Sequence, residues 1–408
     1  MRVLFLSQYF PPECGATQSR TWEMARGLVR GGHTVTVVTE VPNHPAGVVR
    51  PEFRRSLWRR RTEDGVDVLH LWVATSPVKS RARRLSFYGT YALGATLAGL
   101  ALRGRYDVLY ATSPPLTTGA AALILSRLRG LPLVFEVRDL WPESAVALGE
   151  LTSPAAVRWA TRLEEACYRR ARRVVVVTQG IKDALLARNL PPEKVVLIPN
   201  GASTTLHHFS AEGRERVRRE LGAETAFLVV YAGLFGVAQG LDVVLEAARA
   251  LGDRPDIRFV LMGEGPEKAL LQDRVREFGL TRVRLMAERP CEQIHAVLSA
   301  ADAVVVPLRD LPVFRGAVPS KIFDAWACRR PVLLAAEGEG AALVREVGGG
   351  VCVPPENPNA LAEAVLALKD DAAGRAAMGA QGYSYTVANR SRESQADRLR
   401  SLLEEVVA

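Results

Sequence analysis

The chain has 408 residues with 48% hydrophobic positions, and its 53 lysines and arginines against 44 acidic residues give a formal charge of +9. Such a chain is too long for one hydrophobic core and too apolar for disorder, so two domains of about 200 residues each are expected. The five cysteines lie far apart, with no C-x-x-C pair and no histidine at metal-ligand spacing, which disfavours a zinc site and is typical of a cytoplasmic protein.

Residues 1–200 alternate short apolar runs with segments of helical period. Strands that are buried on both faces and joined by helices form a parallel, doubly wound sheet of the α/β class. The pattern therefore predicts a Rossmann-like first domain, whose expected strands are 3–7, 34–39, 66–73, 108–112, 133–137, 174–178 and 195–199.

The region from residue 50 to residue 84 is the most basic part of the chain, with a local charge of +6 out of the total of +9. A patch of this kind favours an anionic surface or polyanionic partner, although it is also compatible with an ordinary solvated face. Few aromatic residues are interleaved with the arginines, which disfavours nucleic acid. The basic residues are Arg50, Arg54, Arg55, Arg59, Arg60, Arg61, Lys79, Arg81, Arg83 and Arg84.

Residues 85–102 carry no charge, and their length is at the lower edge of a membrane span. Three glycines and several hydroxyl residues make the segment a poor span. We expect a helix that is buried against the first sheet or half-sunk in a lipid interface.

The strand pattern restarts after residues 201–214, where the apolar periodicity is lost. A second Rossmann-like domain is predicted over residues 201–383. Its expected strands are 227–232, 259–262, 283–286, 304–307, 332–335 and 351–354, and residues 383–407 have the pattern of a charged amphipathic helix.

A turn of small residues, including Gly15 and Ala16, follows the first predicted strand. Such a turn places backbone N–H groups at the carboxyl edge of the sheet, where an anionic ligand can approach closely. A tight strand-to-helix turn also needs small residues for structural reasons alone, so both interpretations stay open.

A lysine occupies an unfavourable place in the segment PSKIFDAWACRRP. Pro319 and Ser320 are expected to open a helix with Ser320 as its N-cap, and Asp324 follows one turn later. Lys321 falls in the first turn, where a cation opposes the helix dipole. Its position is explained if a phosphate group also binds there.

Two glycine-containing loops follow strands of the second domain, at Gly233–Gly240 and Gly263–Pro266. Both lie at the carboxyl edge of the predicted sheet, where doubly wound sheets bind ligands. Neither matches G-x-G-x-x-G, which argues against a dinucleotide site. Glu264 could accept hydrogen bonds from ligand hydroxyls, or it could simply face water in a turn.

Charged residues of the segment EVRDLWPES, including Glu136 and Asp139, follow an apolar strand of the first domain. We expect them to project into a cleft, with a surface ion network of Arg138, Asp139 and Glu143 as the alternative. No G-x-S-x-G or Walker motif is present, so hydrolase and nucleoside-triphosphatase chemistry are disfavoured.

Together these segments resemble the retaining GT-B glycosyltransferases of family 4, over essentially the whole chain. The resemblance rests on YFPPECGA, GGHTVTVVTE, VVLIPNGAS, VLMGEGPE, ADAVVVPL and PSKIFDAWACRRPV in this order. It implies two Rossmann-like domains facing a central cleft, residues 1–200 with a returning helix 384–408 and residues 201–383. RDLWPES and SPPLTTG resemble a bacterial subgroup that transfers amino sugars or deoxysugars to lipid-linked precursors of surface polysaccharide.

The family's donor site can be carried over only in part. The usual Arg/Lys pair falls at Leu234 or Phe235 and at Gln239, and the first of two family glutamates falls at Gly316. The resemblance then implies that Lys321 and the Ser320 backbone hold the diphosphate and that Asp324 holds the ribose. The remaining donor contacts implied are Gly15, Ala16, Gly233, Gly236, Gln239, Glu264 and Pro319. On the acceptor side, a family histidine falls at Glu136, which leaves Glu136 and Asp139 as candidates for binding the acceptor.

We therefore expect transfer of a sugar from a uridine-diphosphate donor to a lipid-linked saccharide. Lys321, Asp139 and Glu136 are the predicted catalytic residues, and the resemblance implies neither a metal nor a cofactor, because the nucleotide-sugar is a substrate. The basic region and segment 85–102 predict peripheral contact with the inner face of an anionic membrane. The alternatives are a nucleotide-sugar epimerase of the same fold and a non-catalytic regulator.

Overall fold

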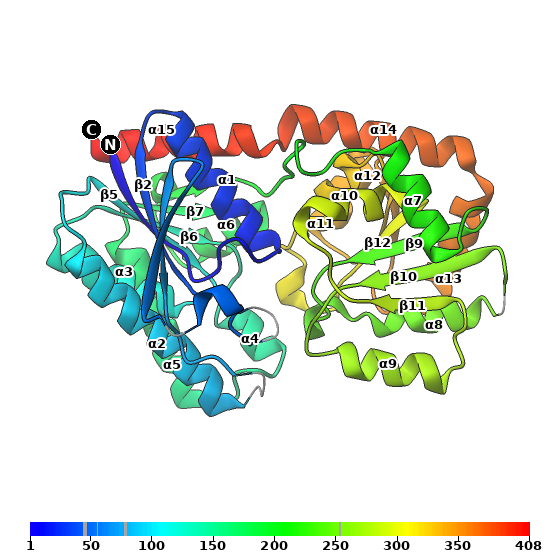
Figure 1. Ribbon diagram of the computed structural model, residues 1–408, viewed down its shortest axis with the longest axis horizontal. Coiled ribbons are helices and arrows are strands. Elements are labelled where there is room, and N and C mark those ends of the chain that lie inside the picture. The colour runs from blue at the N-terminus through cyan, green and yellow to red at the C-terminus, as the bar shows by residue number, and fades with distance from the viewer. Residues whose placement is uncertain (44–46, 55, 77–79, 253) are drawn as a thin grey trace. The chain divides into compact units, whose positions relative to one another are not determined.

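The computed structural model describes residues 1–43, 47–54, 56–76, 80–252 and 254–408 (Figure 1). The chain forms two compact units, Met1–Pro199 with Arg392–Ala408 and Asn200–Ser391. Each unit is a sheet with helices on both faces, in agreement with the predicted α/β class.

Unit 1 contains an eight-stranded sheet in the order β3-β4-β2-β1-β5-β6-β7-β8, in which only β3 runs antiparallel to its neighbour. Strand β3 was not predicted, because its sequence WRRRTE has none of the apolar character of the other strands. It lies at the edge of the sheet, where polar side chains are tolerated. The strands are β1 (Arg2–Leu6), β2 (Thr34–Glu40), β3 (Trp58–Glu63), β4 (Val66–Leu71), β5 (Val108–Ser113), β6 (Leu133–Val137), β7 (Arg173–Val176) and β8 (Val195–Leu197).

Two hydrophobic clusters cover the two faces of this sheet. Helices α1 and α15 pack on one face through residues such as Met24 and Leu399, whereas α2, α3 and α5 pack on the other (Figure 1). The helices are α1 (Ala16–Arg30), α2 (Arg81–Ala101), α3 (Thr117–Leu128), α4 (Glu143–Ala147), α5 (Pro154–Arg170), α6 (Gln179–Ala187) and α15 (Arg392–Val407).

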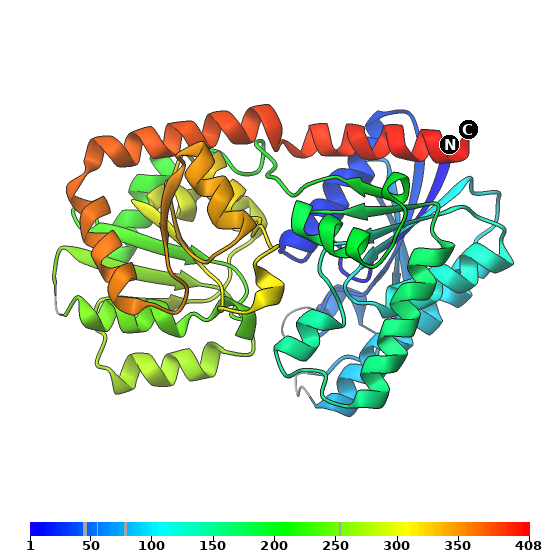
Figure 2. The same ribbon diagram turned by 180° about the vertical axis from the view of Figure 1, so that it is seen from behind.

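Unit 2 contains a six-stranded parallel sheet in the order β11-β10-β9-β12-β13-β14. Helices α8, α9 and α13 cover one face and α7, α10, α11, α12 and α14 cover the other (Figure 2). The strands are β9 (Phe227–Ala232), β10 (Ile257–Met262), β11 (Val283–Met286), β12 (Ala303–Pro307), β13 (Val332–Ala335) and β14 (Gly350–Val353). The helices are α7 (Ala211–Leu221), α8 (Asp242–Ala250), α9 (Lys268–Glu277), α10 (Cys291–Ala300), α11 (Lys321–Ala327), α12 (Glu339–Val347), α13 (Pro358–Asp370) and α14 (Ala372–Asn389).

The predicted single helix 383–407 is two helices, α14 and α15, separated at residues 390 and 391. The Arg390 carbonyl accepts a hydrogen bond from the Ala202 N–H at 3.0 Å, and Ser391 forms a parallel bridge with Ala202. These contacts draw the backbone out of the helical path. The segment that belongs to unit 1 consequently begins at Arg392 and not at the predicted residue 384.

Helix α2 contains residues 85–101 of the uncharged segment. Its N-cap is Ser80, whose hydroxyl accepts a hydrogen bond from the Arg83 N–H at 3.3 Å. Tyr91 and Ala95 are fully buried against the sheet, whereas Leu93 and Leu97 are exposed. The helix is therefore amphipathic and only one of its faces is buried. No helix in the described part of the chain combines the length and the apolar character that crossing a membrane requires.

Candidate functional site

Two loops meet at the carboxyl edge of the unit 2 sheet, after β9 and β10. A Cβ atom on Gly263 would lie 1.8 Å from the Gly233 carbonyl oxygen, so the two backbones are in direct contact there. The Phe235 N–H also donates to the Glu264 carbonyl at 2.8 Å. The glycines at these positions thus create a floor of closely packed backbone, which a larger residue would obstruct.

The Lys321 side chain lies over this floor. A Cβ atom on Gly233 would lie 2.3 Å from Lys321 Cε and 2.9 Å from its Nζ. The ammonium also lies 5.4 Å from the centroid of the Tyr231 ring, within range of a cation–π interaction. Lys321 and Gly233, which were predicted separately, are therefore in contact.

The Lys321 ammonium is short of compensating negative charge. Burial lowers its pKa, and the opposing effect of Asp324 is smaller. Within the residues that the structure describes, no hydrogen bond or ion pair holds this ammonium. A desolvated cation without a close counter-charge is costly, so an anion that binds against Gly233 would remove that cost.

Ser320 lies at the predicted N-cap position of α11, but it does not cap the helix with its side chain. Ser320 already has helical backbone angles, and its hydroxyl makes no capping hydrogen bond. The helical turn starts one residue earlier, because the Ile322 N–H donates to the Pro319 carbonyl at 3.1 Å. Pro319 and Ser320 nevertheless lie directly before Lys321, so their predicted contact with the donor stays a prediction.

Asp324 lies near a residue that sequence analysis missed. His207 Nε2 lies 3.6 Å from Asp324 Oδ1, and His207 Nδ1 is buried without a hydrogen-bond partner in the described structure. The six histidines seemed scattered in the sequence, and no spacing pairs residue 207 with residue 324. The two side chains together offer both a donor and an acceptor for ligand hydroxyls.

Gln239 and Glu264 are partly engaged by their own loops. Gln239 Oε1 accepts a hydrogen bond from the Gly236 N–H at 3.1 Å, and Glu264 forms an ion pair with Lys268. The Gln239 amide nitrogen and the second carboxylate oxygen of Glu264 remain for a ligand. The predicted donor contacts of Gly236, Gln239 and Glu264 are thus compatible with this geometry but are not tested by it.

Arg309, which was not predicted, lies beside the loop that contains Gln239. Its N–H donates to the Ala238 carbonyl at 3.0 Å, and its guanidinium forms ion pairs with Glu356 at 2.9 Å and Asp242 at 3.3 Å. Two carboxylates already neutralise this arginine. Arg309 therefore holds the loop in place and does not replace the cation pair that the family usually has.

In unit 1, Glu136 does not project outward as expected. Its side chain is 1% exposed and lies 2.8 Å from the Arg20 guanidinium, which also donates to the Ile198 and Pro199 carbonyls. Thr112 donates to the second carboxylate oxygen at 3.0 Å. The end of β6 is buried between α1 and β5, so Glu136 fixes neighbouring elements and is not placed to contact an acceptor.

The charges around Glu136 keep it ionised. Burial alone would raise its pKa, but Arg20 and Arg138 outweigh burial and hold the pKa below its ordinary value. Arg138 in turn donates to the Thr17 hydroxyl and, at 2.8 Å, to the Pro114 carbonyl. Arg138 thus connects the segment after β6 to the start of α1. Among the described residues, the alternative surface network of Arg138, Asp139 and Glu143 is not formed, and Glu143 pairs with Arg188.

Asp139 remains the acceptor-side candidate of unit 1. It is half-buried, and the Ser144 hydroxyl donates to its carboxylate at 2.9 Å. Burial raises its pKa above the ordinary value. Carboxylates with raised pKa values at the carboxyl edge of a sheet are candidates for proton transfer.

Gly15 and Ala16 lie where they were predicted, at the start of α1. Gly15 is extended, and a Cβ atom there would lie 2.5 Å from Gln18 Oε1. Because Arg138 contacts Thr17, this turn and the segment of Asp139 lie close together in unit 1. No group of three or more potential metal-binding side chains occurs among the residues that the structure describes.

Comparison with known proteins assigns the family. Residues 15–201 match the family model of the glycosyl transferase 4-like domain, and residues 226–371 match glycosyl transferases group 1. D-inositol 3-phosphate glycosyltransferase 1 of Catenulispora acidiphila is 31% identical over 299 residues, which are 69% of this chain and 68% of that protein. The structure of Anabaena Alr3699/HepE in complex with UDP and glucose has a TM-score of 0.74 and 19% identity, covering 98% of this chain and 99% of that one. The chain belongs to the group 1 glycosyltransferases of GT-B fold.

A further relative of this glycosyltransferase covers most of its length. The putative colanic acid biosynthesis glycosyl transferase WcaI of Escherichia coli (strain K12) is 26% identical over 377 residues, which are 88% of this chain and 90% of that protein. The named relatives are transferases, so the epimerase alternative is not favoured.

Proposed function

We propose that this glycosyltransferase transfers a sugar, with retention of configuration, from a uridine-diphosphate donor to a lipid-linked saccharide in surface polysaccharide or glycolipid synthesis. The observation that carries the proposal is the half-buried Lys321 ammonium over Gly233, which lacks a close counter-charge and is suited to a diphosphate. The likeness to HepE, whose structure contains UDP and glucose, supports the donor class. The likeness to WcaI supports the polysaccharide context.

The proposed reaction needs no protein nucleophile. In a front-face substitution, the acceptor oxygen bonds to the anomeric carbon on the face from which the diphosphate leaves. The bond between that carbon and the diphosphate breaks, and the leaving diphosphate takes the proton of the acceptor hydroxyl. The protein then accelerates the reaction mainly by stabilising the charge that develops on the leaving group. Lys321 supplies this stabilisation, and Asp139 orients the acceptor hydroxyl. No metal or cofactor takes part in this scheme.

A thermal-shift screen of uridine, guanosine and adenosine diphosphates tests the donor class. A diphosphate at 100 times its dissociation constant should stabilise the folded protein by about 2.7 kcal/mol. Stabilisation by UDP alone supports the proposal, whereas stabilisation by another diphosphate alone contradicts it. Release of UDP that depends on a lipid-linked saccharide, with an NMR assignment of the anomeric product, tests acceptor and stereochemistry.

The proposed acceptor is membrane-bound, and α2 offers a surface that suits a membrane. Leu85, Leu93 and Leu97 are 73%, 62% and 59% exposed and follow helical spacing along one face of α2. Arg83 and Arg84 precede them at the amino end of the helix. An apolar stripe next to cations is the pattern of a helix that lies in an anionic lipid interface. Arg55 and Lys79 of the basic region lie outside the described residues.

Liposome flotation tests this membrane contact. The wild-type protein should float with anionic vesicles and less so with neutral ones or at high salt, because each basic residue near an anionic leaflet contributes about 1 kcal/mol. The variant Leu93→Ser/Leu97→Ser should lose most of this binding. Leu270→Ser, an exposed leucine of α9, is the matched control. Equal recovery with neutral and anionic vesicles would contradict the proposal.

A further inference from the structure

Three connections in unit 1 bring arginines to the amino edge of the sheet. Arg105 precedes β5, Arg129 precedes β6, and Arg170 and Arg172 precede β7. These strands are parallel neighbours, so their starting ends lie side by side. This edge is opposite to the carboxyl edge that carries Asp139.

The arginines line a cavity of about 410 Å³. Its volume is in the range of small-molecule sites. The last turn of α15 forms part of its wall, and Asp107 is the one acidic residue in the lining. The lining residues are Arg105, Tyr106, Asp107, Arg129, Gly130, Leu131, Pro132, Arg170, Arg172, Val406 and Val407.

Two of the arginines are held in place by the backbone. Arg129 donates to the Gly99 carbonyl at 2.6 Å and to the Gly104 carbonyl at 2.7 Å, and its guanidinium lies 5.1 Å from the centroid of the Tyr106 ring. Arg170 donates to the Ser126 carbonyl at 3.0 Å. Its Nε is buried without a hydrogen-bond partner in the described structure. These contacts fix the positions of the two guanidinium groups, which keep their positive charge.

Arg105 and Arg172 are exposed. In the part of the chain that the structure describes, none of the four arginines forms an ion pair, and Asp107 accepts a hydrogen bond from the Arg2 N–H at 2.6 Å. Four guanidinium groups around one carboxylate leave a concentrated positive charge. Such a concentration in a concave site attracts small anions.

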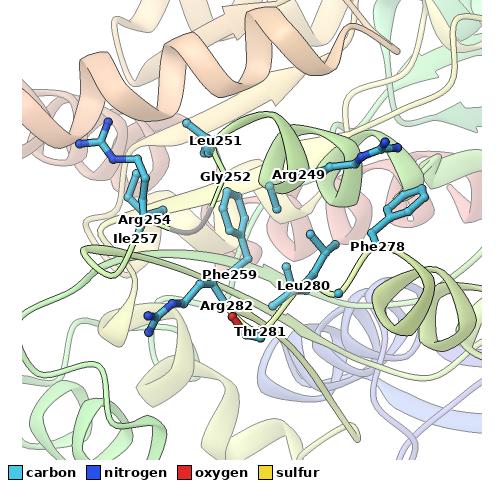
Figure 3. Close-up of a pocket in the computed structure, with 13 residues that line it drawn as sticks. Arg249, Leu251, Gly252, Arg254, Ile257, Phe259, Phe278, Leu280, Thr281 and Arg282 are labelled. Carbon is cyan, nitrogen blue, oxygen red and sulfur yellow. The ribbon is translucent and has the colours of Figure 1, made fainter.

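A second cavity, of about 320 Å³ in unit 2, is less suited to binding an anion (Figure 3). There Arg249 lies against the Phe278 ring, 4.8 Å from its centroid, and Arg254 lies 3.4 Å from the Asp256 carboxylate. Arg254 is thus paired with a carboxylate, whereas in the described structure no ion pair holds an arginine of the unit 1 cavity. The unit 1 cavity is therefore the stronger anion site.

We infer that the unit 1 cavity binds a small phosphate-bearing anion, at a site separate from the one proposed for the donor. Guanidinium groups form charge-assisted hydrogen bonds with phosphate, and four arginines line this cavity. The volume suits a pyrophosphate or a hexose phosphate better than a macromolecule. A site at the opposite edge of the sheet from Asp139 can respond to such an anion without occupying the reaction centre.

Isothermal titration calorimetry with inorganic pyrophosphate and with a hexose phosphate tests this inference on the full chain. Both the wild type and Lys321→Ala should bind at least one of the two anions, because Lys321 belongs to the other site. Arg105→Ser/Arg172→Ser should weaken that binding at least about tenfold, since two charge-assisted contacts are lost. The control Arg158→Ser/Arg162→Ser removes the same charge from exposed positions of α5 and should bind as the wild type does.

The variants leave Arg129 and Arg170 unchanged, because these two residues hold the backbone. A second measurement needs no variant: pyrophosphate should protect Arg105 and Arg172 of the wild type from phenylglyoxal, as detected by mass spectrometry. The inference is overturned by equal affinity in the two double variants, by the absence of binding in Lys321→Ala, or by equal modification with and without the anion. These outcomes leave the proposed transferase activity unaffected, so the two proposals fail separately.

Discussion

Lys321 is the residue on which the proposed chemistry depends most. Lys321→Ala should lower turnover by about 10²–10³-fold, the usual effect of removing one preorganised donor to developing charge. Steady-state kinetics with the donor found in the screen measures this effect. Lys369→Ala is the matched control, because Lys369 is paired with Asp256 elsewhere in unit 2. Turnover of Lys321→Ala within threefold of the wild type would contradict the role of Lys321 in stabilising the leaving group.

Glu136 is expected to matter for stability and not for acceptor binding. Glu136→Gln leaves Arg20 buried without its counter-charge. The free energy of unfolding, measured in urea, should therefore fall by about 3–5 kcal/mol. Glu165→Gln breaks an exposed pair with Arg169 and should cost less than about 1 kcal/mol. A Glu136→Gln variant of wild-type stability with a raised acceptor KM would restore the acceptor role that the sequence predicted.

The sequence located candidate residues better than it defined their roles. Lys321 could be singled out because its position opposes a local rule, the preference for anions in the first turn of a helix. Glu136 was misjudged because nothing in EVRDLW shows that Arg20, which is distant in the sequence, would bury it. The pairing of His207 with Asp324 arises from the tertiary structure and leaves no local pattern.

At the level of elements, the loops after β9 and β10 depend on their glycines. Gly263→Ala would place a Cβ atom 1.8 Å from the Gly233 carbonyl oxygen, so one loop must move. We expect donor affinity to fall at least about tenfold, equivalent to 1.4 kcal/mol, as measured by calorimetry with the diphosphate. Gly89→Ala in α2 meets no atom within 4 Å and should leave donor affinity unchanged. Unchanged affinity in Gly263→Ala would show that the loop is not part of the donor site.

Elements with strong apolar runs were predicted well, and the others were not. The buried central strands of both sheets lie within a few residues of their predicted bounds. Strand β3 was missed, because an exposed edge strand can consist of arginines. The break between α14 and α15 was missed as well, because it is caused by pairing with Ala202 and not by a proline or glycine in the helix.

For the whole molecule, one buried histidine in unit 1 should make stability depend on pH. His70 in unit 1 is 1% exposed, and burial lowers its pKa to about 4, with Arg59 and Arg61 acting in the same direction. The unfolded chain therefore binds a proton near pH 6.5 that the folded unit accepts only near pH 4. The stability that His70 contributes is present above about pH 6.5 and is lost as the pH falls toward 4.

The variant His70→Asn tests this contribution, because its amide can replace the hydrogen bond from His70 Nδ1 to the Glu40 carbonyl. Urea unfolding should show that the free energy of unfolding falls between pH 7 and pH 4 by about 3 kcal/mol more in the wild type than in the variant. Buried Glu164, whose pKa is raised to about 7, acts in the opposite direction and is present in both proteins. If the free energy of unfolding depends on pH in the same way in the two proteins, the prediction is contradicted.

The division of the chain also sets the order in which its parts become complete during synthesis. Unit 2 is one continuous stretch, Asn200–Ser391, whereas unit 1 needs α15, from Arg392 onward, to cover the face of its sheet beside α1. Domains commonly fold from the amino terminus as the ribosome releases them. Here the whole sequence of unit 2 is synthesised before that of unit 1 is complete. One apolar face of the first 199 residues stays uncovered until α15 has been synthesised. The first unit therefore cannot complete the core beside α1 until residues 392–408 have been synthesised.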